Sequence, residues 1–329
     1  MRISILGGSG FLGTNLSKAL CQENISFSIF DIQKSKVFPD KTIVGNICHI
    51  EDLKKIPNSN VLINLAAVHR DDVSPKSLYD EVNVNGSKNV CEYAKKNNIN
   101  HIIFTSSVAI YGFAETDTDE NGEINYFNDY GRTKYLAEKE YINWYSEDPE
   151  NRTVTIIRPT VIFGEGNRGN VFNLLNQIQS KRFVMIGNGE NEKSMAYVGN
   201  VVSFIVYCLN LNKGIHIFNY IDKPDINMNQ LVKKVRNKLF NKNNIGIRLP
   251  KFFGIFVGII ADIFAKAVNK NLPVSYIRVK KFLSSTKSID FDTLISFASI
   301  ITPINFLVIP IFITSFNFSF PRKLIFESK

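Results

Sequence analysis

Three evenly spaced glycines near the N-terminus constrain the fold of this chain more than any other feature. Gly7, Gly10 and Gly13 follow the short apolar run 3–6, which is typical of a buried parallel strand. The apolar spacing after them predicts a helix. Glycine permits a tight turn and a close approach of the backbone to a ligand, and a helix N-terminus attracts phosphate. The stretch therefore predicts a strand, a turn and a helix that bind a dinucleotide pyrophosphate.

A second strand is predicted over residues 27–30, and it ends at Asp31. An acid about 20 residues past such glycines binds the hydroxyl pair of a ribose. Its carboxylate would repel a 2′-phosphate, so the pattern favours NAD over NADP. The alternative is a structural turn followed by a solvated aspartate. We prefer the binding site, because strand, turn, helix and second strand occur in the required order.

The first half of the chain alternates between strand-like and helix-like runs, which predicts an α/β fold with a Rossmann-type, doubly wound parallel sheet. The further strands are predicted over 42–44, 61–65, 101–105 and 154–157, and the helices over 87–97 and 134–145. After residue 164 the pattern loosens into glycine- and asparagine-rich segments around a helix near 171–179. We therefore expect an NAD-binding domain over 1–165, to which later segments can return, and a smaller C-terminal substrate-binding region over 166–290.

Residues 291–329 form an atypical apolar tail. Within it, 294–318 is a run of twenty-five residues without a formal charge, long enough to cross a bilayer but interrupted by Pro303 and Pro310. Three explanations stay open. The tail is membrane-associated, or buried and irregular, or the product of a coding-frame change that replaced the ancestral end, which the abrupt change in composition slightly favours.

The formal net charge is +9, and its location is informative. Residues 231–282 hold twelve Lys or Arg and one acid, Asp262. This fits a solvated face or attraction to an anionic membrane surface, whereas nucleic-acid binding ranks lowest because no aromatic-and-basic motif accompanies the charge. The four cysteines and four histidines never stand at metal-ligand spacing, so we expect no metal site. Unpaired cysteine spacing and the lack of a secretory signal predict reduced thiols and a cytoplasmic protein.

Side chains suited to acid–base chemistry follow the fifth predicted strand. Ser107 comes directly after it, and Tyr130 and Lys134 stand four residues apart on one face of a predicted helix. An ammonium near a phenol lowers its pKa, so a tyrosine can act as a base near neutral pH. A serine hydroxyl can share the substrate oxygen with that tyrosine. A tyrosine and a lysine at this spacing are common by chance, and the glycine-rich loop ahead of them makes the combination specific.

Taken together, these motifs resemble the extended short-chain dehydrogenases/reductases, in particular the NAD-dependent nucleotide-sugar epimerase/dehydratase group that includes UDP-glucose 4-epimerase. The resemblance covers roughly residues 1 to 290. The matching residues are Gly7-Gly-Ser-Gly10-Phe-Leu-Gly13, Asp31, Leu65-Ala-Ala67, Asn83-Val-Asn-Gly86, Ser106-Ser107, Tyr130 to Lys134, Arg158-Pro159 and Phe163-Gly164.

The resemblance implies a role for each matching side chain. Tyr130 would be the acid and base on the sugar 4-hydroxyl, Lys134 would lower its pKa, and Ser107 would orient the 4-oxygen. Asn83 would support the strand ends at the site. The residues implied to bind NAD are Gly7, Gly10, Phe11, Leu12, Gly13, Asp31, Asn46, Ile47, Leu65, Ala66, Ala67, Asn83, Tyr130, Lys134 and Pro159. Those implied to bind substrate are Ser107, Lys193, Arg168 and Arg278.

Departures from the family pattern narrow the activity. The 4,6-dehydratases carry Thr-Asp-Glu where this chain has Ser107-Val108-Ala109, and the missing carboxylates argue against dehydration. Asn46 replaces an aspartate near the adenine, which an amide can still bind. Lys193 stands where many relatives bind the diphosphate with arginine, so Arg168 or Arg278 would share that task.

The sequence therefore predicts an NAD-dependent nucleotide-sugar 4-epimerase that works through a 4-keto intermediate. We expect a UDP-hexose or UDP-N-acetylhexosamine as substrate, used for surface polysaccharide synthesis. The alternatives are an NAD(P)H-dependent 4-keto nucleotide-sugar reductase, a membrane-bound steroid or flavonoid reductase, and a redox-inactive nucleotide-binding regulator. The family also implies a homodimer, and the apolar tail would allow a place at the inner face of the membrane.

Overall fold

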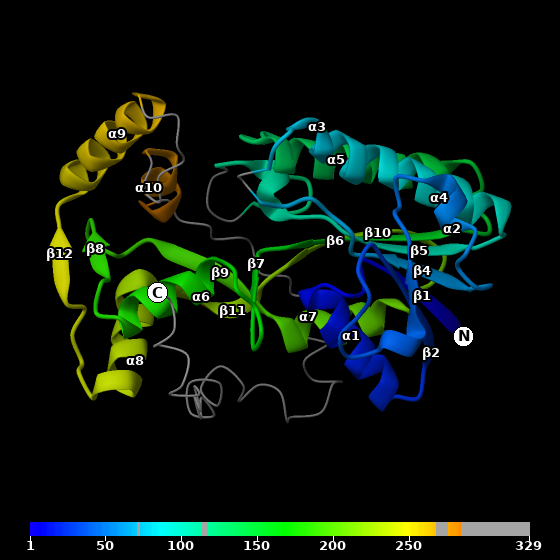
Figure 1. The fold of residues 1–329 in the computed structure, drawn as a ribbon, viewed down its shortest axis with the longest axis horizontal. Helices are drawn as coiled ribbons and strands as arrows, with labels where there is room; N and C mark the ends of the chain where they lie inside the picture. The colour runs from blue at the N-terminus through cyan, green and yellow to red at the C-terminus, as the bar shows by residue number, and fades with distance from the viewer. Residues whose placement is uncertain (71–72, 114–117, 268–275, 284–329) are drawn as a thin grey trace, which may run out of the picture. The chain divides into compact units, whose positions relative to one another are not determined.

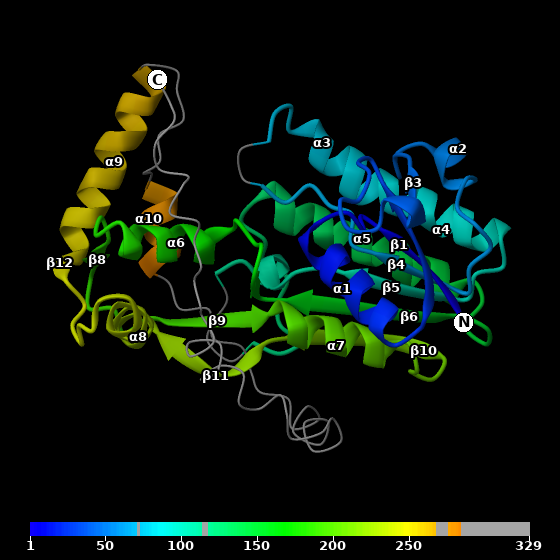
Figure 2. The same cartoon turned by 60° about the horizontal axis from the view of Figure 1, so that its bottom comes forward.

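The computed structural model describes residues 1–70, 73–113, 118–267 and 276–283 (Figures 1 and 2). Within these ranges, residues 1–173 and 192–225 form one compact unit, and residues 174–191 and 226–283 form a second. Residues 192–225 thus belong to the first unit although they follow the boundary predicted at 165. The predicted apolar tail, 291–329, lies outside the described residues.

The first unit is built on a seven-stranded parallel sheet with the strand order β10-β6-β5-β4-β1-β2-β3. Its strands are β1 (Arg2–Leu6), β2 (Ser26–Asp31), β3 (Thr42–Val44), β4 (Val61–Asn64), β5 (His101–Thr105), β6 (Thr153–Pro159) and β10 (Gly214–Tyr220). The chain runs outward from β1 to β3 and then returns to add β4 on the other side of β1. The strand order thus reverses between β1 and β4. In such sheets ligands bind at this switch point, outside the C-terminal ends of the strands. The Rossmann-type fold predicted from the sequence is confirmed.

Helices cover both faces of this sheet. Helices α1 (Phe11–Gln22) and α7 (Val198–Cys208) pack together on one face, and α4 (Gly86–Lys96) and α5 (Asp129–Ser146) on the other, as Figure 1 shows. The core under α4 and α5 is aromatic and aliphatic, and the rings of Phe104 and Tyr141 lie 4.5 Å apart between centroids. This packing fixes α5, which carries Tyr130 and Lys134, against the strand end that carries Ser107.

Short helical turns join these elements. They are η1 (Pro39–Lys41), α2 (Ile50–Leu53), α3 (Ser77–Tyr79), the π-helical turn η2 (Asp80–Asn85) and η3 (Val108–Tyr111). η2 contacts α3, α4 and α5, so it connects three helices at the C-terminal side of the sheet. A smaller sheet with the order β11-β9-β7 follows, made of β7 (Val161–Phe163), β9 (Glu192–Tyr197) and β11 (Asp222–Asn227).

The second unit contains helices and one short parallel strand pair. Strands β8 (Val184–Ile186) and β12 (Ile247–Leu249) pair with each other, and helix α6 (Asn170–Gln179) leads from the first unit into this one. Helix α8 (Met228–Phe240) begins with a capping box, in which Asn227 and Gln230 satisfy each other's backbone N–H groups. Helices α9 (Lys251–Ala267) and α10 (Tyr276–Leu283) pack against each other. Among the helices described, none is both long enough and apolar enough to cross a membrane.

Candidate active site

The glycine-rich turn lies between β1 and α1, where its backbone is too close to its neighbours for a side chain. Gly7 has a φ of +76°, and a Cβ there would lie 2.6 Å from the backbone nitrogen of Ala66. A Cβ on Gly13 would lie 2.5 Å from the Cα of Gly8. These two glycines therefore let β1, the start of α1 and the segment after β4 converge.

The N-terminus of α1 is suited to an anion. Gly10 is its N-cap and has no side chain to occupy the first N–H groups, and the first turn, which holds Phe11 and Leu12, contains no acid. The unsatisfied N–H groups and the helix dipole favour a phosphate at such an end. The turn thus provides a cradle that fits the pyrophosphate of NAD.

Asp31 ends β2 directly beside this turn. Its carboxylate accepts hydrogen bonds from the backbone N–H groups of Ser9 and Gln33, each at 3.0 Å. The Asn46 side-chain oxygen accepts from the N–H of Cys48 at 3.0 Å, and the buried Ile47 accepts at its carbonyl from the Asn89 amide, also at 3.0 Å. Asp31 is therefore held against the glycine-rich turn, and its contact with a ribose stays a prediction. Asn46 and Ile47 lie in the loop that follows β3.

The segment after β4 contains Leu65, Ala66 and Ala67. Strand β4 lies on one side of β1, and β2, which ends at Asp31, lies on the other. The Leu65 N–H donates to the Leu6 carbonyl at 2.8 Å, and the Ala66 N–H donates to the Asn64 side-chain oxygen at 3.0 Å. Pro159 is buried at the end of β6. All the predicted cofactor residues thus lie in the first unit, at the strand ends or on the elements that follow them, and their contacts with NAD stay a prediction.

Ser107, Tyr130 and Lys134 are brought together by β5 and α5. Ser107 caps η3, accepting from the Ala109 N–H at 3.2 Å, and η3 contacts α5, the helix that carries Tyr130. Lys134 lies one helical turn after Tyr130; it is 2% exposed, with its Nζ 4.2 Å from the centroid of the Phe104 ring. The three predicted catalytic side chains therefore converge at the carboxyl end of β5.

The start of α5 is fixed by Asn128, which the sequence analysis did not single out, and by Gly131, which it gave only as part of the Tyr130 to Lys134 match. The Gly131 N–H donates to the side-chain oxygen of Asn128 at 2.9 Å, which caps the helix. A Cβ on Gly131 would lie 2.4 Å from the Ala109 carbonyl oxygen. Glycine at this position therefore lets the first turn of α5 approach the segment of Ser107. The glycine directly after Tyr130 in the sequence could have predicted this close approach.

Burial dominates the electrostatics of the acid–base pair. It raises the pKa of Tyr130, although the hydrogen bond from Ser107 acts in the opposite direction. Burial also lowers the pKa of Lys134 to about 7, against the opposing attraction of Glu138. The lowering of the Tyr130 pKa that the sequence predicted from Lys134 is not found, because burial removes much of the charge from Lys134 near neutral pH.

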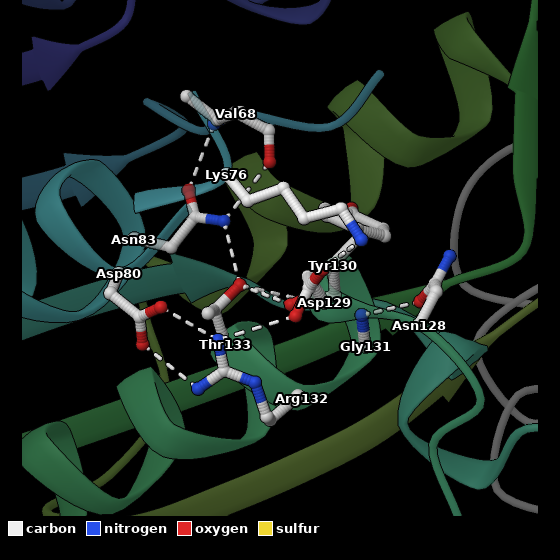
Figure 3. Close-up of polar contacts among 10 residues, drawn as sticks. All are labelled: Val68, Lys76, Asp80, Asn83, Asn128, Asp129, Tyr130, Gly131, Arg132 and Thr133. Atoms are coloured by element: carbon white, nitrogen blue, oxygen red, sulfur yellow. Dashed lines mark hydrogen bonds and ion pairs between the residues drawn. The ribbon is translucent and has the colours of Figure 1, made fainter. Parts of the chain in front are cut away.

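A hydrogen-bonded bridge joins α5 to the segment after β4 (Figure 3). The Asn83 amide nitrogen donates to the Thr133 hydroxyl and to the Val68 carbonyl, each at 3.0 Å, while its oxygen accepts from the Val68 N–H at 2.8 Å. These contacts hold Asn83 between α5 and the segment after β4, and its support of the strand ends stays a prediction. Its predicted contact with NAD is untested.

An ion pair reinforces the same junction. Arg132 forms a bidentate pair with Asp80, with distances of 2.8 and 2.6 Å, and lies 3.5 Å from Asp129. Lys76 lies 3.7 Å from the other oxygen of Asp129. The Arg132 guanidinium lowers the pKa of the Asp80 carboxyl. Figure 3 shows these groups around the first turn of α5. The sequence pattern gave no sign of this pairing, because Asp80 and Arg132 lie on separate elements.

A second, buried ion pair holds the other side of α5. The Arg158 guanidinium on β6 donates to both oxygens of Glu138, at 3.0 and 2.7 Å, and both side chains are almost fully buried. Arg158 also donates to the Tyr111 hydroxyl at 2.6 Å, which in turn donates to Asn219 at 2.9 Å. The arginine of the Arg158-Pro159 motif therefore joins α5, β6 and η3.

The cations predicted to bind the diphosphate lie on separate elements. Lys193 is in β9, where burial lowers its pKa to about 8, and the exposed Arg168 lies just before α6. Arg278 lies in α10 of the second unit. Their role in binding substrate stays a prediction. Within the described ranges, no group of three or more His, Cys, Asp and Glu could hold a metal ion.

A dinucleotide cradle beside a serine, tyrosine and lysine constellation defines an NAD-dependent enzyme of the short-chain dehydrogenase/reductase class. Residues 3–220 match the NAD dependent epimerase/dehydratase family, and the chain belongs to this family. The enzyme class and the NAD cofactor predicted from the sequence are thereby confirmed.

Individual relatives agree with this assignment. The chain is 47% identical over 288 residues to an N-acetyl-α-D-glucosaminyl-diphospho-ditrans,octacis-undecaprenol 4-epimerase of Escherichia coli O157:H7, which covers 87% of this chain and 86% of the relative. It is 27% identical over 248 residues to a UDP-glucose 4-epimerase of Vibrio cholerae, and this match covers 71% of this chain and 74% of the relative. The crystal structure of a Thermus thermophilus UDP-glucose 4-epimerase in complex with NAD shares the fold, with a TM-score of 0.64 and 17% identity. The match covers 76% of this chain and 86% of that structure's chain.

Proposed function

We propose that the protein is an NAD-dependent 4-epimerase of an N-acetylhexosamine that is carried on a diphosphate. The observation that carries this proposal is the placement of Tyr130 and the buried Lys134 one turn apart on α5, a helix that contacts η3, which Ser107 caps. The 4-epimerase names of the relatives support the same carbon as the site of reaction. The prediction of a sugar 4-epimerase made from the sequence agrees with these relatives.

The residues of this chain supply the proton chemistry. As the phenolate, the Tyr130 Oη takes the proton of the sugar 4-hydroxyl and later returns it, while the Ser107 hydroxyl holds the 4-oxygen by hydrogen bonding. Lys134 is close to half protonated near neutral pH, so it can support both states of the phenol. When bound, NAD supplies a reversible acceptor for the hydride of C4. Hydride returned to C4 from the opposite face of the 4-keto sugar, with the proton returned to the 4-oxygen by Tyr130, would give the epimer with no net redox change.

Epimerisation is favoured over the alternatives by what surrounds this centre. The positions that carry carboxylates in dehydratases are Val108 and Ala109. Asp31 beside the glycine turn suits NAD, which is regenerated within each epimerisation cycle. A reductase would instead consume a reduced cofactor in each turnover, and a redox-inactive regulator would not need the Ser107, Tyr130 and Lys134 arrangement.

Two carriers of the sugar are candidates. The sequence analysis predicts UDP, and the Vibrio cholerae relative is named for a UDP-sugar. The relative with 47% identity is named for a sugar linked through a diphosphate to undecaprenol, which makes a polyprenyl-linked sugar the second candidate. Both present a pyranose on a diphosphate, so the chemistry at C4 is the same for both.

The experiment is to incubate the purified protein, without added cofactor, with UDP-N-acetylglucosamine or with N-acetylglucosaminyl diphosphoundecaprenol in detergent. Ring-proton NMR of the sugar, released by mild acid in the second case, identifies its configuration at C4. Formation of the N-acetylgalactosamine epimer from either substrate supports the proposal and identifies the carrier. No epimer from either, with oxidation of NADH or NADPH by a 4-keto sugar nucleotide, would make the enzyme a reductase.

We further propose a homodimer at the cytoplasmic side of the membrane. The four cysteines are free thiols, which suits a reducing compartment. The dimer would form through α4 and α5, and the apolar tail would provide membrane association. Light scattering of the purified protein tests the first point, and fractionation of cells with and without residues 291–329 tests the second.

A further inference from the structure

Helix α9 of the second unit presents an apolar face to solvent. We define this face as the exposed Phe, Val and Ile side chains between positions 252 and 264. Phe252, Phe256 and Ile263 are 69%, 59% and 64% exposed, and their spacing of four and seven residues places them on one side of the helix. Single exposed apolar residues are common, but a continuous helical face of this kind marks an interaction site.

The other side of α9 is packed, so the exposure of the apolar face does not come from a loosely placed helix. A Cβ on Gly254 would lie 2.4 Å from the side chain of Ile186 in β8, which shows how closely the two elements approach. The Asp262 carboxylate accepts from the N–H of Tyr276 at the start of α10, at 3.0 Å. Figures 1 and 2 both show α10 beside α9. The second unit therefore holds α9 with its apolar face outward.

The sequence of α9 and α10 is rich in basic residues. Helices α9 and α10 contain five Lys or Arg and one acid, Asp262, whose carboxylate is already bonded to the backbone. Lys251 is exposed at the first position of α9, and Lys266 is next to its last position. A second copy of the chain docked on this face would bring like charges together. An anionic lipid surface offers both hydrocarbon and negative charge.

We propose that α9 binds the surface of an anionic phospholipid bilayer, with the apolar face inserted among the acyl chains and Lys251 at the headgroups. A helix with one packed side lies in the plane of the interface, because only its outer half is available to lipid. This binding surface consists of α9 residues and does not depend on the carrier of the sugar. It would bring the enzyme to the place where a polyprenyl-linked sugar lies.

The test is flotation of the full-length protein with vesicles of phosphatidylcholine alone and of phosphatidylcholine mixed with phosphatidylglycerol. Wild type should float with the mixed vesicles and much less with the neutral ones, and added salt should weaken the binding. Phe256→Asp should lower the partition coefficient roughly tenfold or more, since burial of one Phe side chain contributes about that much. The double variant Phe252→Asp/Ile263→Asp should abolish flotation.

The matched control is Val37→Asp, which places the same charge on an apolar side chain that is 46% exposed in the first unit. It should float like wild type. Circular dichroism and NAD binding confirm folding of each variant without reference to epimerase activity. Flotation of Phe256→Asp at the wild-type level would place the lipid contact elsewhere, including residues 284–329, and would overturn the proposal. A wild-type dimer that Phe256→Asp converts to monomer, without vesicle binding, would identify a second copy as the occupant and also overturn it.

Discussion

The side-chain amide of Asn83 donates a hydrogen bond to the hydroxyl of Thr133 at 3.0 Å, and this contact joins the segment after β4 to the helix of Tyr130 and Lys134. Thr133 in turn donates to the carbonyl of Asp129, one turn back along α5. The segment after β4 and the helix of Tyr130 and Lys134 are therefore joined by a buried hydrogen-bonded bridge, next to the Arg132–Asp80 ion pair.

Thr133→Val should weaken this bridge, because it leaves a buried N–H of Asn83 without an acceptor. The expected loss is about 1–3 kcal/mol in the free energy of unfolding, with a lower kcat. Urea unfolding and steady-state kinetics measure both. Thr133→Ser keeps the hydroxyl and should restore most of the kcat, whereas equal losses in Ser and Val variants would contradict a role for the hydrogen bond.

Tyr130→Phe should lower turnover by about 10²–10⁴-fold, because the proton of the 4-hydroxyl loses its acceptor. The variant should still contain NAD, since the glycine turn and Asp31 are unchanged. Epimerase assays and the absorbance of released cofactor measure the two quantities. Turnover near the wild-type rate would remove Tyr130 from the mechanism.

Asp31→Ala should weaken NAD binding and reduce discrimination against NADP, because the carboxylate that repels a 2′-phosphate is gone. It also removes the acceptor of the Ser9 N–H in the glycine turn. Titration with both cofactors gives the ratio of dissociation constants. Asp40→Ala, an exposed acid in η1, is the control and should leave that ratio unchanged. An unchanged ratio in Asp31→Ala would show that Asp31 does not select the cofactor.

Lys134→Met should stabilise the cofactor-free protein most in mild acid. The folded-state pKa of Lys134 is about 7, below the ordinary 10.5, so folding disfavours its charged form. This cost is fully present below the folded-state pKa and falls as pH rises from there towards the unfolded value. The gain in unfolding free energy over wild type should therefore be larger at about pH 6 than at about pH 9.

Chemical unfolding at the two pH values measures this difference for Lys134→Met. Lys139→Met changes an exposed lysine of the same helix and should give a gain that is small and independent of pH. A pH-independent effect of Lys134→Met would mean that Lys134 stays charged in the folded state.

Removing either partner of the buried Arg158–Glu138 pair should destabilise the protein by about 3–5 kcal/mol, because an uncompensated charge stays buried. The double variant Arg158→Met/Glu138→Leu should lose less than the sum of the single variants. Thermal unfolding of the four proteins completes the cycle. Additive losses would show that the two side chains do not depend on each other.

The order of the first six strands of the main sheet, β1 to β6, could be predicted from the sequence, because each is a short apolar run and Gly7 and Gly13 mark the first crossover. The seventh strand, β10, was not predicted. Ser107, Tyr130 and Lys134 could be predicted as a group, since the strand end and the helical spacing place them together.

Long-range polar contacts could not be predicted in the same way. The Arg132–Asp80 and Arg158–Glu138 pairs depend on how separate elements pack, and no local pattern records that. The pKa of Tyr130 was expected to fall, whereas burial raises it, because the depth at which a side chain lies follows from tertiary packing. The outward direction of the apolar residues of α9 likewise became visible only when its packed side was known.

The central claim is that one tyrosine and one recycled NAD invert C4 through a 4-keto sugar. Its most direct test uses substrate deuterated at C4, on whichever carrier is turned over, in ordinary water without added cofactor. We predict an epimer that keeps its deuterium at C4, because the same hydride leaves and returns. Loss of deuterium to solvent, or no epimer from a protein that contains NAD, would contradict the account.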